Sequence, residues 1–183
     1  GFPGGLPPES PPSAYFSNNV DLQLAVEDKP AVWRCPLIEK GDNVTTFREF
    51  LLDEAPGSLL AGLRECGLAD DIALNWLYQD ESVGWLALVF SSDHPDAIQQ
   101  HVERWLQALR HTSPEQQMHY YKLAQRRFDA LTPLEQLRQR ALGFAPDSPP
   151  VDFAGFCASL LSAPASSLVC RKIAAGDGVA TQG

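Results

Sequence analysis

Two neighbouring apolar segments constrain the fold of this chain most strongly. Residues 72–78 place large apolar side chains at every second position, which is typical of a half-buried strand. Residues 83–90 form an almost unbroken apolar run, which is typical of a central strand covered on its faces. Only Gln79 to Ser82 separate the two segments. Strands joined by so short a turn must be antiparallel, so the sequence predicts a β-hairpin.

Helical periodicity dominates the chain after the hairpin. Residues 95–110 repeat apolar residues at helical spacing, and a last helix is expected at about residues 151–161. Ser113 and Thr132 are each followed by proline, and this pattern predicts that each begins a further helix. The apolar stripe of the helix that begins at Thr132 consists of Leu134, Leu137, Ala141 and Leu142.

Two more helices are predicted before the hairpin. Thr46 and Glu49 have the spacing of a capping box, in which the threonine side chain caps the helix that follows it. Ser58 has the character of a second N-cap. Gly67 is expected to end that second helix, because glycine accepts the left-handed backbone that follows many helices.

Short strands are also expected at residues 22–26, 31–38 and 167–173. The order of elements then predicts an α+β fold, in which a small, largely antiparallel sheet forms one layer and helices cover one of its faces. This single domain is expected to span residues 20–175. Proline and glycine are frequent in residues 1–19, which are predicted to be a linker. The small, polar residues 176–183 are predicted to be a flexible tail.

Charge and hydropathy exclude two classes of partner. The chain has 14 Lys and Arg residues against 23 Asp and Glu residues, a net charge of −9. Nucleic acids and anionic membrane surfaces attract basic proteins and repel acidic ones, so neither is expected as a partner. Residues 153–170 carry no charge, but a proline, a glycine and four serines make them too polar and broken to span a bilayer.

Cysteine usage points to a compartment. The four cysteines are far apart and form no C-x-x-C pair, which favours free thiols in a reducing environment. The first residues show no basic segment followed by an apolar run, the pattern of a secretory signal. We therefore expect a cytoplasmic protein.

The residues that carry chemistry indicate neither a catalytic nor a metal site. None of the four histidines lies in an H-E-x-x-H or H-x-x-E-H arrangement, which would bring two imidazoles onto one zinc ion. Cys66 follows the apolar side of its predicted helix and is expected to belong to the core. An independent enzyme would have only Cys66, Asp70 and His94 from which to build its site.

One stretch resembles a known family. Its residues are Phe47-x-x-Phe50-Leu51-Leu52-x-x-Ala55-Pro56-Gly57-Ser58-Leu59-Leu60-x-x-Leu63-Arg64-x-x-Gly67-Leu68-Ala69. They are similar to the second domain of pitrilysin/insulinase zinc peptidases, where a Gly-Pro-Gly-Ser-Leu-Leu-like turn joins two helices. Position 55 is alanine where relatives often have glycine. The element order agrees over about residues 20–145, and residues 126–137 look most like the member that serves pyrroloquinoline quinone (PQQ) biosynthesis.

The resemblance implies a non-catalytic role within a larger peptidase. Family members have four related domains around a chamber, and the first holds zinc through H-x-x-E-H and a distal glutamate. This sequence lacks those ligands, so no metal-binding residue can be carried over to it. The resemblance therefore implies that zinc is bound by the catalytic domain of the parent chain. It also implies that this chain contacts that domain and forms part of the wall of a chamber that receives a precursor peptide of PQQ biosynthesis.

The same resemblance implies a binding edge for the peptide substrate. In relatives, the strand after the Pro-Gly-Ser helix is an open edge that faces the chamber and pairs with the substrate peptide. The matching positions here are Ile72, Ala73, Leu74, Asn75 and Trp76. A covered or purely structural strand is the alternative at these positions.

Two other functions remain open from the sequence. A scaffolding protein of the same fold would have no peptidase anywhere in its parent chain, and the presence of H-x-x-E-H upstream separates it from the peptidase. An independent enzyme with a site outside known motifs is the third hypothesis.

Overall fold

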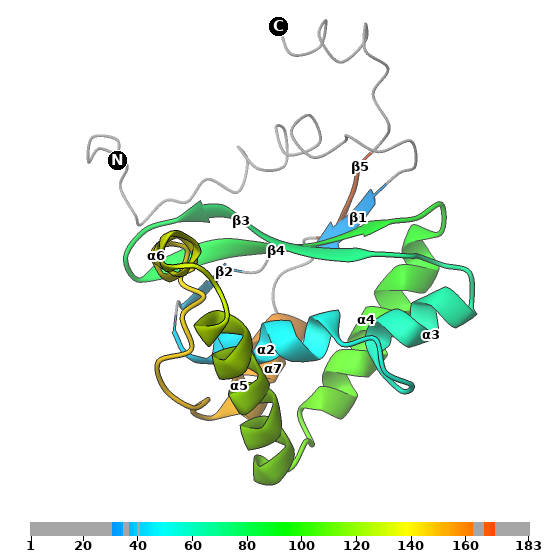
Figure 1. Ribbon diagram of the computed structural model, residues 1–183. Coiled ribbons are helices and arrows are strands. Elements are labelled where there is room, and N and C mark those ends of the chain that lie inside the picture. The colour runs from blue at the N-terminus through cyan, green and yellow to red at the C-terminus, as the bar shows by residue number, and fades with distance from the viewer. Residues whose placement is uncertain (1–30, 35–36, 40, 163–166, 171–183) are drawn as a thin grey trace, which may run out of the picture.

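The computed structural model describes residues 31–34, 37–39, 41–162 and 167–170 (Figure 1). Three of the sequence predictions lie outside these residues and have no structural account. They are the linker at residues 1–19, the strand at residues 22–26 and the tail at residues 176–183.

A five-stranded antiparallel sheet forms one layer of the fold, and β4 (Val83–Ser91) is its central strand. β3 (Ile72–Gln79) pairs with one edge of β4. β1 (Ala31–Arg34) and β2 (Leu37–Glu39) follow one another along the opposite edge. β5 (Ser167–Cys170) pairs with β1. The largely antiparallel sheet predicted from the sequence is confirmed.

Local chemistry explains the hairpin. The Oδ1 atom of Asp80 accepts hydrogen bonds from the backbone N–H groups of Ser82 at 2.8 Å and Val83 at 2.9 Å, which fixes the turn between β3 and β4. Within the strand predicted over residues 31–38, the structure describes β1 and β2, which pair with β4 in one continuous antiparallel register. They pair with different segments of β4, residues 88–91 and 83–85.

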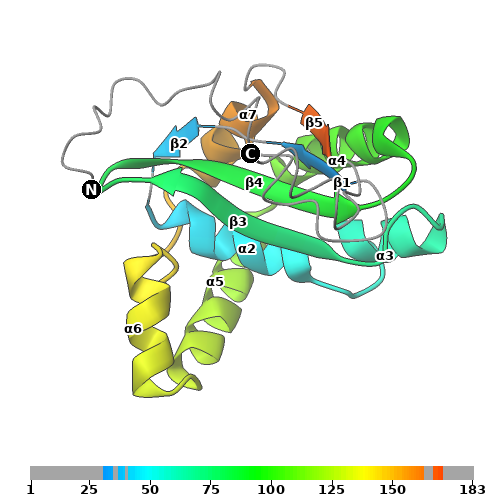
Figure 2. The same ribbon diagram turned by 90° about the horizontal axis from the view of Figure 1, so that it is seen from above.

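Most of the helices form the second layer, on one face of the sheet, whereas the helix at residues 133–141 lies level with the sheet (Figure 1). α5 (Pro114–Asp129) and α6 (Pro133–Ala141) extend beyond the outer edge of β3 (Figure 2). Of the helices described, none is both long enough and apolar enough to cross a bilayer. The helices are α2 (Asn43–Leu52), α3 (Leu59–Glu65), α4 (Pro95–Leu109), α5 (Pro114–Asp129), α6 (Pro133–Ala141) and α7 (Phe153–Ser162).

Three helices begin at the residues that the sequence predicts. The side-chain oxygens of Ser58, Ser113 and Thr132 each accept a hydrogen bond from the backbone N–H three residues later, at 3.1, 3.1 and 3.2 Å. Gly67 follows α3 with a φ of +68°, and the N–H of Leu68 donates to the oxygen of Leu63 at 2.8 Å. This pattern is a Schellman motif, which ends the helix as predicted.

The capping box predicted at Thr46 is wrong. α2 begins one turn earlier at Asn43, and Thr46 is completely buried inside the helix. Val44, Phe47 and Leu51 are all fully buried on the same helix. The spacing of these three residues sets which face of α2 meets the core. Each buried side chain contributes about 1.5–3 kcal/mol, so the burial of all three outweighs the loss of one N-cap.

The core lies between the sheet and the helical layer. Leu86, Leu88 and Phe90 project from one face of β4 and are at most 2% exposed. The stripe predicted on α4 is buried against the same core, with Ile98 and Leu106 fully inaccessible. α6 differs from α4, because it has no buried residue at all.

Candidate functional site

β3 is an edge strand within the described part of the chain. Each of its pairings is with β4, from Ile72 opposite Phe90 to Gln79 opposite Gly84. No other strand among the described residues lies on the far side of β3. The backbone N–H and C=O groups that point away from β4 are therefore available to pair with an added strand.

The five candidate residues alternate between the core and solvent. Ile72 is 8% exposed, and Leu74 and Trp76 are half-buried and pack against the core. Ala73 and Asn75 are exposed on the other face of the strand. This alternation confirms the predicted direction of these five side chains. Within residues 72–76, the side chains on the exposed face are the small ones of Ala73 and Asn75.

The loop before β3 is held by two contacts. The Schellman motif at Gly67 turns the chain away from α3. The guanidinium Nε of Arg64 then donates to the backbone oxygen of Asp70 at 3.0 Å, two residues before the strand begins. Both contacts fix where β3 starts. Arg64 also forms an ion pair with Glu54, which adds little stability because it is exposed.

An aromatic and cationic cluster supports β3 from the helical layer. The ring centroids of Trp76 and Phe144 are 6.1 Å apart, and the Arg48 guanidinium lies 4.6 Å from the Phe144 centroid. Arg48 Nη1 also donates to Gln139 Oε1 at 3.0 Å. Burial lowers the pKa of Arg48, and the neighbouring carboxylate of Glu49 acts against that shift.

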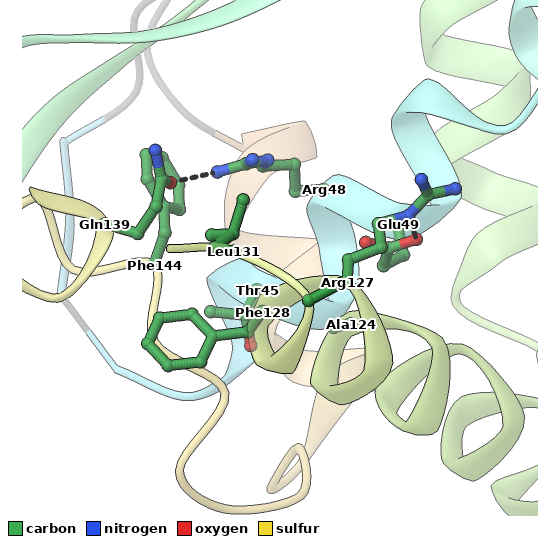
Figure 3. A pocket seen from close by; sticks show the side chains of 10 residues that line it. Thr45, Arg48, Glu49, Ala124, Arg127, Phe128, Leu131, Gln139 and Phe144 are labelled. Atoms are coloured by element: carbon green, nitrogen blue, oxygen red, sulfur yellow. Dashed lines mark hydrogen bonds and ion pairs between the residues drawn. The ribbon is translucent and has the colours of Figure 1, made fainter. Parts of the chain in front are cut away.

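A cavity of about 360 Å³ lies beside this cluster, between α2, α5 and α6 (Figure 3). The Nε atom of Arg127 donates to Glu49 Oε1 at 2.9 Å in its wall. Thr45 supplies the one hydroxyl in the lining, and that hydroxyl donates to the backbone oxygen of Asp42 at 3.1 Å. The cavity thus offers aromatic and cationic surface, and no nucleophile in its lining is paired with a base. No sequence pattern predicted Arg48, Phe144 and Gln139 as members of this cluster, because they are distant in sequence and belong to no motif.

The structure corrects the prediction for Cys66. Its side chain is exposed at the end of α3 instead of lying in the core. No hydrogen bond or ion pair in the described residues joins Cys66 to Asp70 or His94, which are both exposed as well. Cys157 is the buried thiol, and burial raises its pKa to about 12, so it is a poor nucleophile.

The described part of the chain contains no donor set for a metal. No three His, Cys, Asp or Glu side chains there are grouped closely enough to hold an ion. The zinc that the family resemblance implies therefore has no fitting ligands among these residues.

Comparison with known proteins identifies the family. Residues 37–168 match the family described as "PQQ synthase PqqF, N-terminal lobe domain 2". The chain belongs to this family. Coenzyme PQQ synthesis protein F of Klebsiella pneumoniae is 64% identical over 162 residues, which are 88% of this chain and 21% of that protein. The Pseudomonas aeruginosa protein of the same name is 32% identical over 150 residues, 77% of this chain and 19% of that protein.

A solved structure shows the same fold. The crystal structure of pitrilysin superposes on 84% of this chain and 22% of its own chain, with a TM-score of 0.53 and 17% sequence identity. The α+β class and the resemblance to pitrilysin-type peptidases are both confirmed. This PqqF-family chain spans about a fifth of the length of the curated relatives that it matches.

Proposed function

We propose that the chain is the non-catalytic second domain of a pitrilysin-type zinc metallopeptidase that acts in PQQ biosynthesis. The match to the PqqF domain over residues 37–168 supports this proposal, as does the pitrilysin-like fold. In this proposal the domain forms part of the chamber wall beside the catalytic domain of a longer parent chain. The free thiols of Cys66 and Cys157 suit a reducing, cytoplasmic location.

The proposed contribution of this domain to the reaction is to bind and orient peptide. Zinc, with the activation of water that it supplies in such enzymes, is assigned to the catalytic domain of the parent chain. The described residues of this chain hold no group of three metal-ligand side chains. They supply instead a rigid strand beside which a peptide backbone can be fixed.

One observation carries the binding role: β3 pairs with β4 alone in the described part of the sheet. A peptide added along residues 72–76 would form main-chain hydrogen bonds, each of which contributes about 0.5–1.5 kcal/mol net. These bonds do not depend on the side chains of the peptide. The exposed Ala73 and Asn75 leave room for the neighbouring strand, while Trp76 anchors the edge to the core.

Proline substitution in the longer parent protein tests this binding mode. Asn75→Pro removes one backbone N–H, and Asn75→Ala is the control that changes the side chain and keeps that N–H. The expected result is about tenfold weaker binding of the precursor peptide by Asn75→Pro, an unchanged melting temperature and normal binding by Asn75→Ala. Unchanged binding by a folded Asn75→Pro protein contradicts the proposal.

A second pair of variants covers the case in which the backbone N–H of residue 75 points toward β4. Successive N–H groups of a strand point to opposite edges, so Asn75→Pro unfolds the protein if its N–H belongs to the ladder with β4. The outer N–H groups then include that of residue 74. Leu74→Pro is compared with Leu74→Ala in that case, and the same loss of peptide binding is expected from the proline variant only.

The parent sequence itself tests the peptidase assignment. An H-x-x-E-H motif upstream of these residues is expected in a zinc peptidase of this type. A parent chain without it would instead be a scaffolding protein of the same fold.

A further inference from the structure

α6 has its polar and apolar faces reversed relative to an ordinary surface helix. Gln136 Nε2 donates to the backbone oxygens of Phe128 at 3.1 Å and Leu131 at 3.3 Å, and Gln139 accepts from Arg48. These glutamines therefore face the domain. An amphipathic surface helix normally turns its apolar stripe toward the core and its polar residues toward water.

The leucines of α6 face solvent. Leu134 is 62% exposed and Leu137 is 65% exposed. At 3.6 residues per turn, Leu137 and Gln139 lie on nearly opposite sides of the helix, about 200° apart. Ala141 continues the same stripe four residues after Leu137 and is exposed too. The stripe expected from the sequence is thus present, but it is turned away from this domain.

A helix in this situation needs a partner. α6 has nine residues, none of which is buried, and isolated helices shorter than about 12–15 residues are marginal in water. Most helical stability in proteins comes from packing an apolar face, and the described residues provide no surface against which this face packs. α5 and α6 also project beyond the edge of β3, where a neighbouring body can reach them (Figure 2).

We infer that the face formed by Leu134, Leu137 and Ala141 docks on another domain of the same longer polypeptide. The match covers only 21% of the Klebsiella pneumoniae relative, so most of that protein lies outside the matched region and can supply such a surface. This inference rests on the proposed function only in that both place the chain within a longer protein.

Charge indicates the character of the docking surface. Residues 114–142, which form α5 and α6, carry five Lys and Arg residues against three Asp and Glu residues, in a chain whose net charge is −9. Three of these cations, Arg127, Arg138 and Arg140, already pair with carboxylates of this chain, whereas Lys122 and Arg126 are exposed on α5. The partner surface in this inference is an apolar groove with a carboxylate at its rim, which would complement the leucines and these exposed cations together.

Photo-crosslinking in the longer protein identifies the occupant. A photoreactive benzoyl-phenylalanine replaces Leu137. The control carries the same group at Val151, which is 71% exposed and whose backbone is hydrogen-bonded to the Asn43 side chain at the start of α2. The expected product is a crosslink within one polypeptide, from position 137 to a residue outside this chain, at about ten times the yield at position 151. Crosslinks between two copies, or a yield no greater than that of the control, overturn the inference.

A substitution gives an independent measurement. Leu134→Gln with Leu137→Gln is expected to accelerate amide exchange in residues 133–141 of the longer protein by about tenfold, while Val151→Gln leaves it unchanged. Equal exchange in the double variant and the control overturns the inference. Neither measurement uses peptide, so failure here leaves the role of the β3 edge intact, and loss of that role leaves these outcomes unaffected.

Discussion

The guanidinium of Arg48 lies 4.6 Å from the ring centroid of Phe144, and through this contact α2 is linked to the edge of the sheet. Phe144 in turn packs against Trp76 of β3, with their ring centroids 6.1 Å apart. The Nη1 atom of the same guanidinium donates a hydrogen bond to Gln139 Oε1 at 3.0 Å. One partly buried cation thus connects α2, α6 and the strand proposed to bind peptide. Its removal should therefore weaken the packing of all three elements.

Replacement of Arg48 by alanine is expected to lower the free energy of unfolding by about 1–3 kcal/mol, because it removes the cation–π contact and the hydrogen bond. Arg48→Lys is expected to recover only part of this loss, since an ammonium cannot match the planar guanidinium. Urea unfolding measures the change. The control is Arg126→Ala on exposed surface, expected within about 0.5 kcal/mol of the unchanged protein. Equal effects at positions 48 and 126 would refute the role of the cluster.

Two glycines at α3 are expected to respond to alanine in opposite directions. Gly67 has a φ of +68°, which costs a residue with a Cβ atom about 1–2 kcal/mol, so Gly67→Ala should destabilise the protein. Gly62 lies inside α3, and a methyl group added there would meet no atom within 4 Å, so Gly62→Ala should stabilise the protein by about 0.5–1 kcal/mol. Thermal unfolding of the two variants gives the sign of each change. Stabilisation by Gly67→Ala would contradict the Schellman motif.

Local sequence signals predicted the helix starts and the hairpin because the interactions that fix them are themselves local. The side chain of Ser58 caps a backbone N–H only three residues away, and Asp80 fixes its turn across three residues. Such contacts involve residues only a few positions apart, so they can form whatever the rest of the fold is. The alternation in residues 72–76 was predictable for a similar reason. A strand that is covered on one face places its apolar side chains at every second position, whatever element covers it.

Features set by distant residues could not be predicted in this way. The start of α2 depends on the packing of Phe47 against Trp105 and Phe156, which lie far along the chain. The contact of Arg48 with Phe144 joins residues nearly a hundred positions apart, and no short motif encodes it. The direction in which the Leu137 stripe points also could not be predicted from the sequence. Periodicity identifies an apolar face of a helix but not the domain or element against which that face packs.

Cys66 and Cys157 should differ sharply in their reactivity toward alkylating reagents. Cys66 is exposed, whereas burial raises the pKa of Cys157 to about 12. The thiolate is the species that reacts, so iodoacetamide near neutral pH should label Cys66 and spare Cys157 until the protein unfolds. Peptide mapping by mass spectrometry measures each site separately. Early labelling of Cys157 in the folded protein would show that its site is open to solvent.

Tyr120 should make stability depend on pH in the alkaline range. Its hydroxyl donates to Asp53 Oδ2 at 2.7 Å, and its ring stacks on Phe50 with centroids 3.9 Å apart. Burial, then the hydrogen bond to Asp53 and its charge, raise the pKa of Tyr120 from 10 to about 12. A phenol whose pKa is raised on folding favours the folded state while it is protonated. Its contribution is therefore complete below pH 10 and is lost as the pH rises toward 12.

Thermal unfolding between pH 9 and pH 12 tests this dependence, with the expected fall in melting temperature beginning near pH 10. Tyr120→Phe should flatten part of that fall, because it removes the titrating group while keeping the ring on Phe50. Asp53→Asn should move the tyrosine titration to lower pH without bringing it to the ordinary value, since burial, the larger cause, remains. If the alkaline profiles of Tyr120→Phe and the unchanged protein coincide, the bond to Asp53 does not couple this tyrosine to folding, and the contact between α5 and the segment after α2 rests on ring stacking alone.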